Sequence, residues 1–464
     1  MSIEIKRGPG SLPSKWGKAE TVLHRLSLFT FGAMLILSPF RIRFVMLTRP
    51  IPPIYKDYTD FMLFGSDVFL LITLALWGVM RLFNSRRLNY GPIFLTIPIV
   101  GVILTGFISA IYSIDPALTL YHSIRLLLLF GLYLYIINEI HRIEELVLPV
   151  SLMLFVQAIV GIGQILRQQS IGMGILGELD LNATWHGVSV VTAGGIRSLR
   201  AYGLADHPNI LGGCLAFGLV IIAGWYVTSK ARWRTISTAL YCLASLALFY
   251  TYSRSAWLAF ISAMIIILAL LYRSKRLVAA RNWTQLVAAC FIVLLPFLWQ
   301  NASYLGVRLN SQRSFQQNPQ ENQSIGERLL LNNAANDIFA NHPLTGVGLG
   351  AFPLALRDRY PDLPVDYQPA HFTLLDAAAE VGIFGALAYA LAMTAPWLAL
   401  WLNRKRLAIS PPLITVTALL WAVSMVGFFD YYTWLLAPGR IWQYLAWGLW
   451  GLVYHSSHLS VAYD

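Results

Sequence analysis

Apolar runs close to 20 residues long recur along the chain and constrain its fold more than any other feature. About 20 apolar residues in a helix cross the hydrocarbon core of a bilayer. Twelve such runs are found, at 26–47, 60–80, 91–113, 117–138, 145–166, 207–228, 236–252, 255–272, 285–300, 373–402, 411–430 and 437–454. With 57% hydrophobic and 12% charged residues over 464 positions, the composition is not that of a soluble globular protein. The sequence therefore predicts an all-α, polytopic membrane helix bundle of about 12 transmembrane helices.

The positive charges indicate how this bundle lies in the membrane. Residues 1–25 are basic and lack a small-residue cleavage site, so we expect no removable signal peptide and an amino terminus on the inner side. The short inner turns then carry Arg81, Arg86, Arg87, Arg142, Lys230, Arg232, Arg234, Arg273, Lys275, Arg276, Arg281, Arg404, Lys405 and Arg406. This pattern follows the positive-inside rule. The net charge of +12 is thus a topology signal, and we expect no nucleic-acid partner.

Two long outer segments, 167–206 and 301–372, interrupt the short turns of what we expect to be a single integral membrane domain over 1–464. Functional residues tend to lie in long loops of this kind. The larger segment is expected to contain short helices. After a polar stretch at 312–323, the apolar spacing through 325–340 predicts a helix near the membrane interface.

Three spans begin at the outer face with clear helix-start signals. These are Asp206-His207-Pro208 before the span at 207–228, Ser253 or Ser255 before the span at 255–272, and Thr373 with Asp376 as a capping box at 373–402. The partly positive amino-terminal end of each helix would face outward, where it favours anions.

Two outer arginines lie where a cation needs a partner. Arg254 stands in Tyr-Ser-Arg-Ser-Ala-Trp between two apolar runs, where a charge left at mid-membrane costs about 2.5 to 3.5 kcal/mol. It either snorkels to the outer surface or binds an anion. Arg200 either pairs with Asp206 or faces an outer ligand. Apart from Lys56, the cations placed outside are arginines, Arg328 among them, and their planar fork suits phosphate oxygens.

His371 ends the larger outer segment just before an apolar helix. A neutral imidazole near pH 7 can accept a proton from an attacking hydroxyl, so His371 is a candidate general base. The alternative is a structural residue at the helix start, bonded to a backbone carbonyl. Asp376 and Glu380 are four residues apart and share one helix face. They either orient the histidine or stabilise the helix.

Metal and nucleotide sites find little support in the sequence. No two of the outer histidines His207, His342 and His371 have the close sequence spacing of metal ligands. Neither a disulfide nor a thiolate metal site is predicted for Cys214, Cys242 and Cys290, which fall inside spans. The glycine-rich segment at 341–352 lacks the Lys and Ser/Thr of a nucleotide loop. We expect its glycines to allow a tight reversal of the chain.

Four segments together resemble the O-antigen ligase and O-antigen polymerase superfamily. They span 200–212, 251–259, 328–352 and 371–385, and their order and spacing carry the resemblance. The plan of about twelve spans with a large late outer loop is similar as well. The resemblance covers most of residues 195–390, whereas the first five spans match only in being apolar.

The resemblance implies a metal-independent glycosyltransferase without a cofactor, in the lipids of a bacterial inner membrane and with its active site facing the periplasm. Such an enzyme moves a glycan from a polyprenyl diphosphate carrier to a hydroxyl of a lipid-linked acceptor or a growing polysaccharide. By this resemblance Arg200 and Arg254 hold the diphosphate and His371 activates the acceptor. Supporting candidates are Arg328, His207, Asp376 and Glu380. The family usually has a small polar residue after the histidine, where this chain has Phe372, which leaves the acceptor open.

Two alternatives share part of this pattern. A transporter would have a similar number of spans, and it predicts charged groups near mid-membrane, for which Arg125 and Asp67 are the candidates. An oligosaccharyl transferase acting on proteins would use the same donor and differ in its acceptor. Ligase and polymerase activities are not distinguished by the sequence.

Overall fold

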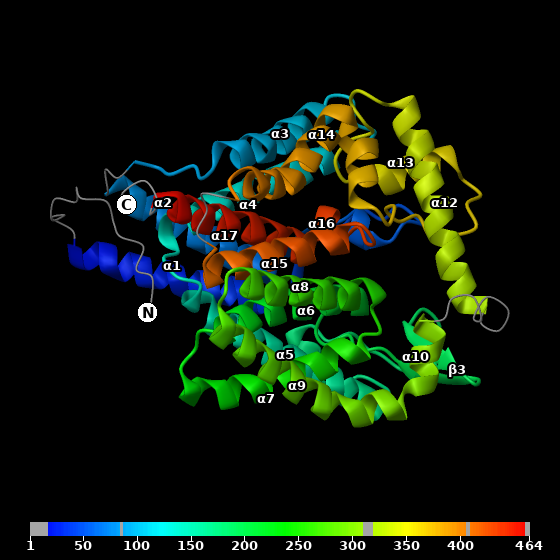
Figure 1. The fold of residues 1–464 in the computed structure, drawn as a ribbon. Helices are drawn as coiled ribbons and strands as arrows, with labels where there is room; N and C mark the ends of the chain where they lie inside the picture. The colour runs from blue at the N-terminus through cyan, green and yellow to red at the C-terminus, as the bar shows by residue number, and fades with distance from the viewer. Residues whose placement is uncertain (1–16, 84–86, 310–318, 405–408, 460–464) are drawn as a thin grey trace.

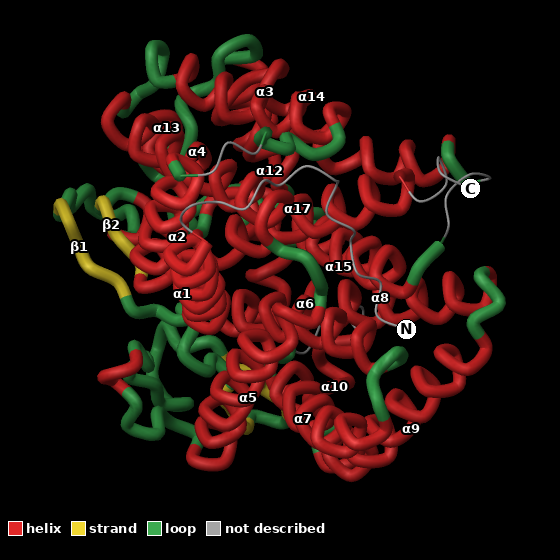
Figure 2. The backbone as a smooth tube through the Cα atoms, turned by 90° about the vertical axis from the view of Figure 1, so that its left-hand side faces the viewer, coloured by secondary structure: helices red, strands yellow, loops and turns green. Residues whose placement is uncertain are grey.

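The computed structural model describes residues 17–83, 87–309, 319–404 and 409–459. Over these residues the chain is mostly helical, and its long helices run side by side, with two small two-stranded sheets at the periphery (Figures 1 and 2).

Each of the twelve predicted apolar runs overlaps a helix. In the first half of the chain these are α1 (Gly17–Leu37), α2 (Gly65–Leu82), α3 (Ile93–Ser109), α4 (Pro116–Glu139), α5 (Glu144–Arg167) and α6 (Pro208–Tyr226). In the second half they are α7 (Ala231–Tyr250), α8 (Arg254–Arg273), α9 (Leu277–Gln300), α14 (Thr373–Leu402), α15 (Pro411–Gly427) and α17 (Ala437–Leu459).

The lengths and compositions of these helices test the membrane prediction. Over the described ranges, 8 helices are long and apolar enough to cross a membrane, and α3 and α15 are shorter apolar helices. The prediction of a multi-pass helical membrane protein is therefore confirmed. The number of about twelve spans stays a prediction, because α7 begins with Arg232 and Arg234 and α17 is rich in Trp and Tyr.

The first predicted run, 26–47, is divided in the structure. Its first part belongs to α1, which begins earlier, at Gly17. Its last part is β1 (Arg43–Leu47), which pairs antiparallel with β2 (Phe61–Phe64) around the short 3₁₀ helix η1 (Lys56–Tyr58). Residues 44–47 are exposed along β1 although they are apolar. Hydropathy alone cannot separate this hairpin from a continuous span.

Helix α6 lies in the middle of the bundle (Figure 2), and 94% of its most apolar 18-residue stretch is buried. It packs against α5, α7, α8, α15 and α17. Glycines allow these close approaches. A Cβ at Gly213 would lie 1.8 Å from Oη of Tyr432, and one at Gly224 would lie 2.0 Å from Oγ1 of Thr415.

Both long loops lie at one end of the bundle, here called the loop end (Figure 1). It carries η2 (Gly174–Leu176), the hairpin of β3 (Val190–Ala193) and β4 (Ile196–Leu199), and the helices α10 (Ala302–Leu309), α12 (Pro319–Asn341), α13 (Phe352–Arg359) and α16 (Tyr432–Leu435). Helix α12 lies across this end and contains the helix predicted at 325–340. Part of the polar stretch predicted at 312–323 lies outside the described residues. That the loop end faces outward remains a prediction.

The glycine-rich segment closes against a break in α14. Gly382 has φ 70° and ψ −175°, so the helical hydrogen bonding stops there. The freed carbonyls of Ala379 and Glu380 accept hydrogen bonds from the amides of Val347 and Gly348, both at 2.9 Å. The segment therefore caps the carbonyls freed at this break in α14 from the side, and the predicted reversal of the chain stays a prediction.

Candidate active site

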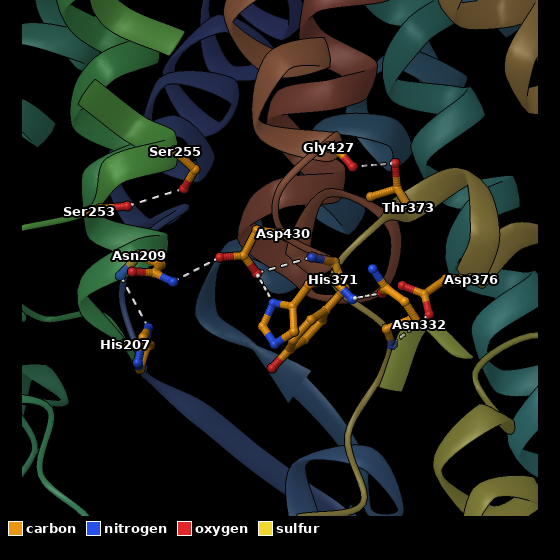
Figure 3. Close-up of polar contacts among 12 residues, drawn as sticks. His207, Asn209, Ser253, Ser255, Asn332, His371, Thr373, Asp376, Gly427 and Asp430 are labelled. Carbon is orange, nitrogen blue, oxygen red and sulfur yellow. Dashed lines mark hydrogen bonds and ion pairs between the residues drawn. The ribbon is translucent and has the colours of Figure 1, made fainter. Parts of the chain in front are cut away.

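His371 lies at the loop end, where α6, α8 and α14 begin (Figure 3). Its backbone amide donates to Oδ1 of Asn332 on α12 at 3.1 Å. Its side chain is 13% exposed. Because Nδ1 is buried and makes no hydrogen bond with the described residues, the ring reaches the surface through its other atoms.

A carboxylate that the sequence did not reveal faces the buried side of this ring. Oδ1 of Asp430 lies 3.9 Å from Nδ1 of His371, too far for a hydrogen bond but in the right place to form one after a shift of about 1 Å. The Asp430 side chain is held by the amide of Tyr431 at 3.0 Å and by Nδ2 of Asn209 at 2.8 Å. Asp430 is 3% exposed.

Arg200 joins this group through Asn209. Its Nη2 donates to Oδ1 of Asn209 at 2.6 Å, and its Nε donates to the carbonyl of Thr251 at 2.7 Å. Asp206, the partner considered for Arg200, pairs with Arg41 at 2.7 Å. Arg200 is 7% exposed, so its guanidinium lies inside the site rather than at the surface.

The other predicted phosphate ligand, Arg254, begins α8 next to the same turn. Ser253 caps this helix, its Oγ accepting from the amide of Ala256 at 3.4 Å. The carbonyl of Tyr252 accepts from Nη2 of Arg308 at 2.7 Å. Together with the Arg200 bond to Thr251, the turn at 251–254 gathers three arginines.

The surroundings of His207 are positively charged, and this affects the pKa of its ring. It caps α6, because its Nδ1 accepts from the amide of Asn209 at 3.1 Å, and its Nε2 lies 3.0 Å from Oγ of Ser189. Its pKa is lowered well below the ordinary value, first by burial and then by the charges of neighbouring arginines, Arg200, Arg328 and Arg308. His207 is thus neutral and surrounded by cations, and this surrounding favours an anion.

The same physics keeps His371 neutral. The pKa of His371 is lowered to about 4, chiefly because the ring is buried; the charge of Asp430 opposes this shift and the charge of Arg328 adds to it. A neutral imidazole at pH 7 can accept a proton. The structure thus brings together Arg200, His207, Arg328 and His371.

The two predicted carboxylates on α14 do not contact the His371 ring. The capping-box prediction is wrong, because Phe372 is the N-cap of α14 and makes no side-chain cap. Oδ1 of Asp376 instead accepts from the amide of Ala370 at 2.8 Å, which fixes the backbone just before His371. Oε2 of Glu380 accepts from Nε1 of Trp434 at 2.8 Å, deeper in the bundle.

Residues of the amino-terminal hairpin region also line the site. The ring of Tyr431 meets the ring of His371 edge to face, with centroids 5.3 Å apart. The hydroxyl of Tyr431 lies 2.6 Å from that of Tyr58 in η1. No residue near Tyr58 stood out in the sequence, because this contact joins segments 373 residues apart.

One comparison with known proteins bears on this geometry. The sequence model of the O-antigen ligase family matches residues 238–390. The matched range contains Arg254, Arg328 and His371, and Arg200, Asn209 and Asp430 lie outside it. No curated protein matches the chain. The match confirms the predicted resemblance to the O-antigen ligase and O-antigen polymerase superfamily over residues 238–390.

Proposed function

We propose that this protein is a glycosyltransferase that moves a glycan from a polyprenyl diphosphate carrier to an acceptor hydroxyl on the outer, periplasmic face of a bacterial inner membrane. The acceptor is a lipid-linked or growing glycan, as for the ligases and polymerases of the superfamily. One observation carries the proposal: a largely buried, neutral histidine, His371, faces a carboxylate and lies beside a cluster of arginines.

These side chains suit the chemistry of such a transfer. The acceptor oxygen attacks the anomeric carbon and gives its proton to His371, while the bond from that carbon to the diphosphate oxygen breaks. The electron pair leaves with the diphosphate, whose charge Arg200 and Arg254 stabilise together with the amino-terminal ends of α6 and α8. Asp430 stabilises the protonated imidazole from the Nδ1 side. The proposal assigns the positive charge to arginines and includes no metal.

The transporter alternative finds less support in the structure. Nη2 of Arg125 lies 2.8 Å from Oδ2 of Asp67, and the two side chains are only 13% and 12% exposed. Arg125 also donates to the carbonyl of Met62 at 3.0 Å. The two charges expected to serve a carrier therefore pair with one another in a largely buried ion pair.

The direct test is transfer by the purified protein in liposomes. A polyprenyl diphosphate-linked oligosaccharide is supplied with candidate acceptors, and released polyprenyl diphosphate is measured. We expect release that requires an acceptor and that a chelator of divalent metals leaves unchanged. Solute flux across the same liposomes without any release would favour a transporter. A peptide acceptor used in preference to glycans would favour the protein oligosaccharyl transferase.

Removing the charge of Arg254 is expected to slow transfer strongly. A positioned donor that stabilises developing negative charge is worth about 10²- to 10³-fold in kcat, so we expect Arg254→Ala to lose rate in this range. Arg273 lies at the other end of the same helix and is exposed. Arg273→Ala is the matched control and should keep the wild-type rate. Equal rates for both variants would exclude Arg254 from diphosphate binding.

The pH dependence should report the low pKa of His371. Its neutral form is the base, and burial lowers its pKa to about 4. The value of kcat/KM should therefore stay flat as the pH falls from 8 toward 5 and should decrease only below that. Asp430→Asn removes the charge that raises this pKa, and should move the acidic limb to lower pH. A limb near the ordinary histidine value of about 6.5 would contradict this assignment.

A further inference from the structure

Four polar side chains follow one another through the site, the first three joined by hydrogen bonds and the last two by a longer ion-pair contact. Nη2 of Arg200 donates to Oδ1 of Asn209 at 2.6 Å, and Nδ2 of Asn209 donates to Oδ2 of Asp430 at 2.8 Å. The other oxygen of Asp430 lies 3.9 Å from Nδ1 of His371 (Figure 3). Asn209 therefore lies between the arginine proposed to hold the donor and the carboxylate behind the proposed base.

The chemistry of an amide fits this place, and that of the similar side chains does not. An asparagine presents one acceptor and two donors on the same planar group. Its oxygen must face the guanidinium, which only donates, and its nitrogen must face the carboxylate, which only accepts. An aspartate would turn an acceptor toward Asp430. An alanine would leave two largely buried charged groups without this partner, which is costly.

The first turn of α6 fixes where this amide points. Asn209 follows Pro208 at the amino-terminal end of α6, and its backbone amide is held by Nδ1 of His207. Asp430 lies just after the end of α15, 221 residues further along the chain, and its carboxylate accepts a hydrogen bond from this amide. The contact with His207 is local, but the contact with Asp430 is not, so the link exists only in the folded site.

We propose that Asn209 is a positioning residue that couples donor binding at Arg200 to the placement of the base His371 through Asp430. This inference rests on the proposed function. When the donor diphosphate engages Arg200, the guanidinium and the amide bonded to it move together. Asp430 follows the amide, and a shift of about 1 Å brings Oδ1 within hydrogen-bond range of Nδ1 of His371. The base is then oriented when the donor is in place.

A double-mutant cycle tests this coupling. Transfer rates in liposomes are measured for Arg200→Lys, Asp430→Asn and the double variant, in three backgrounds: wild type, Asn209→Ala and Asn332→Ala. Asn332 is the matched control, because it is an asparagine of the same site whose side chain contacts His371 only through the backbone amide. Residues joined by one hydrogen-bond network give non-additive losses, whereas independent residues give losses that multiply.

In the wild-type background we expect the double variant to lose about threefold less than the product of the single losses. This coupling should vanish with Asn209→Ala and persist with Asn332→Ala. Asn209→Ala alone should lower kcat by about 10- to 100-fold and leave the donor KM nearly unchanged. A residue that only stabilised the fold would lower the amount of active enzyme and leave the coupling in place.

The outcomes separate the inference from the proposed function. Coupling that survives in Asn209→Ala, or that is missing from a wild type that transfers glycan, would overturn the inference alone. A wild type without transfer would overturn both. If Asn209→Ala does not fold, Asn209→Asp gives the same test, since it keeps the acceptor toward Arg200 and opposes Asp430. Coupling of unchanged size in that variant would also refute the link.

Discussion

His371→Ala is expected to lower the rate of glycan transfer by about 10²- to 10⁴-fold, the range that a positioned general base contributes. The imidazole is neutral because burial lowers its pKa to about 4, and Asp430 faces its Nδ1. Alanine removes the proton acceptor and leaves the arginines in place. Binding of the polyprenyl diphosphate donor should therefore be preserved, and the loss should appear in kcat. The measurement is released polyprenyl diphosphate at saturating donor and acceptor.

A histidine of the same loop provides the control. His342 follows α12, and its side chain is exposed. His342→Ala should transfer glycan at the wild-type rate. A His371→Ala variant that keeps more than about a tenth of the rate would mean that the acceptor reacts without this base. His371 would then be a structural residue at the start of α14, the alternative that its position in the sequence leaves open.

The bundle could be predicted from the sequence because one physical signal dominates it. A helix that crosses a membrane must be apolar over its length, so hydropathy finds it. The prediction was wrong at 26–47, where the polar residues Lys18, Glu20 and Arg25 conceal the start of α1. The apolar end of that run forms a strand at the loop end. Hydropathy carries no information on whether an apolar segment is a helix or a hairpin.

The candidate site could be predicted only in part, for a related reason. Arg254 and His371 stand out because each is polar beside a long apolar run. Asp430 ends such a run as well, but its position at the end of the apolar span 411–430 gives it no signal of its own. Its importance comes from Asn209 and His371, which tertiary packing brings to it. Asn209 looked like one more residue of a helix start, since a hydrogen bond between segments so far apart leaves no local pattern.

Gly346→Ala is expected to destabilise the protein by on the order of 3 kcal/mol. Gly346 has φ +66°, a conformation that an L side chain adopts at a cost, and its added Cβ would lie 2.3 Å from the backbone carbon and oxygen of Glu380. These are helix backbone atoms and cannot rotate away. The clash would push the glycine-rich segment off α14 and break the hydrogen bonds to Ala379 and Glu380. Melting temperature and monodisperse yield in detergent measure the loss.

The control for this variant is a glycine in the same loop without these constraints. Gly326 lies within α12, and none of the described atoms is within 4 Å of the position that its Cβ would take. Gly326→Ala should therefore raise stability slightly, by about 0.5 to 1 kcal/mol, since alanine favours a helix more than glycine does. Opposite signs for the two variants would show that the segment is locked onto the break in α14. A Gly346→Ala protein that melts with the wild type would show that the segment is free to move, and the first turns of α14 would then need another support to hold His371.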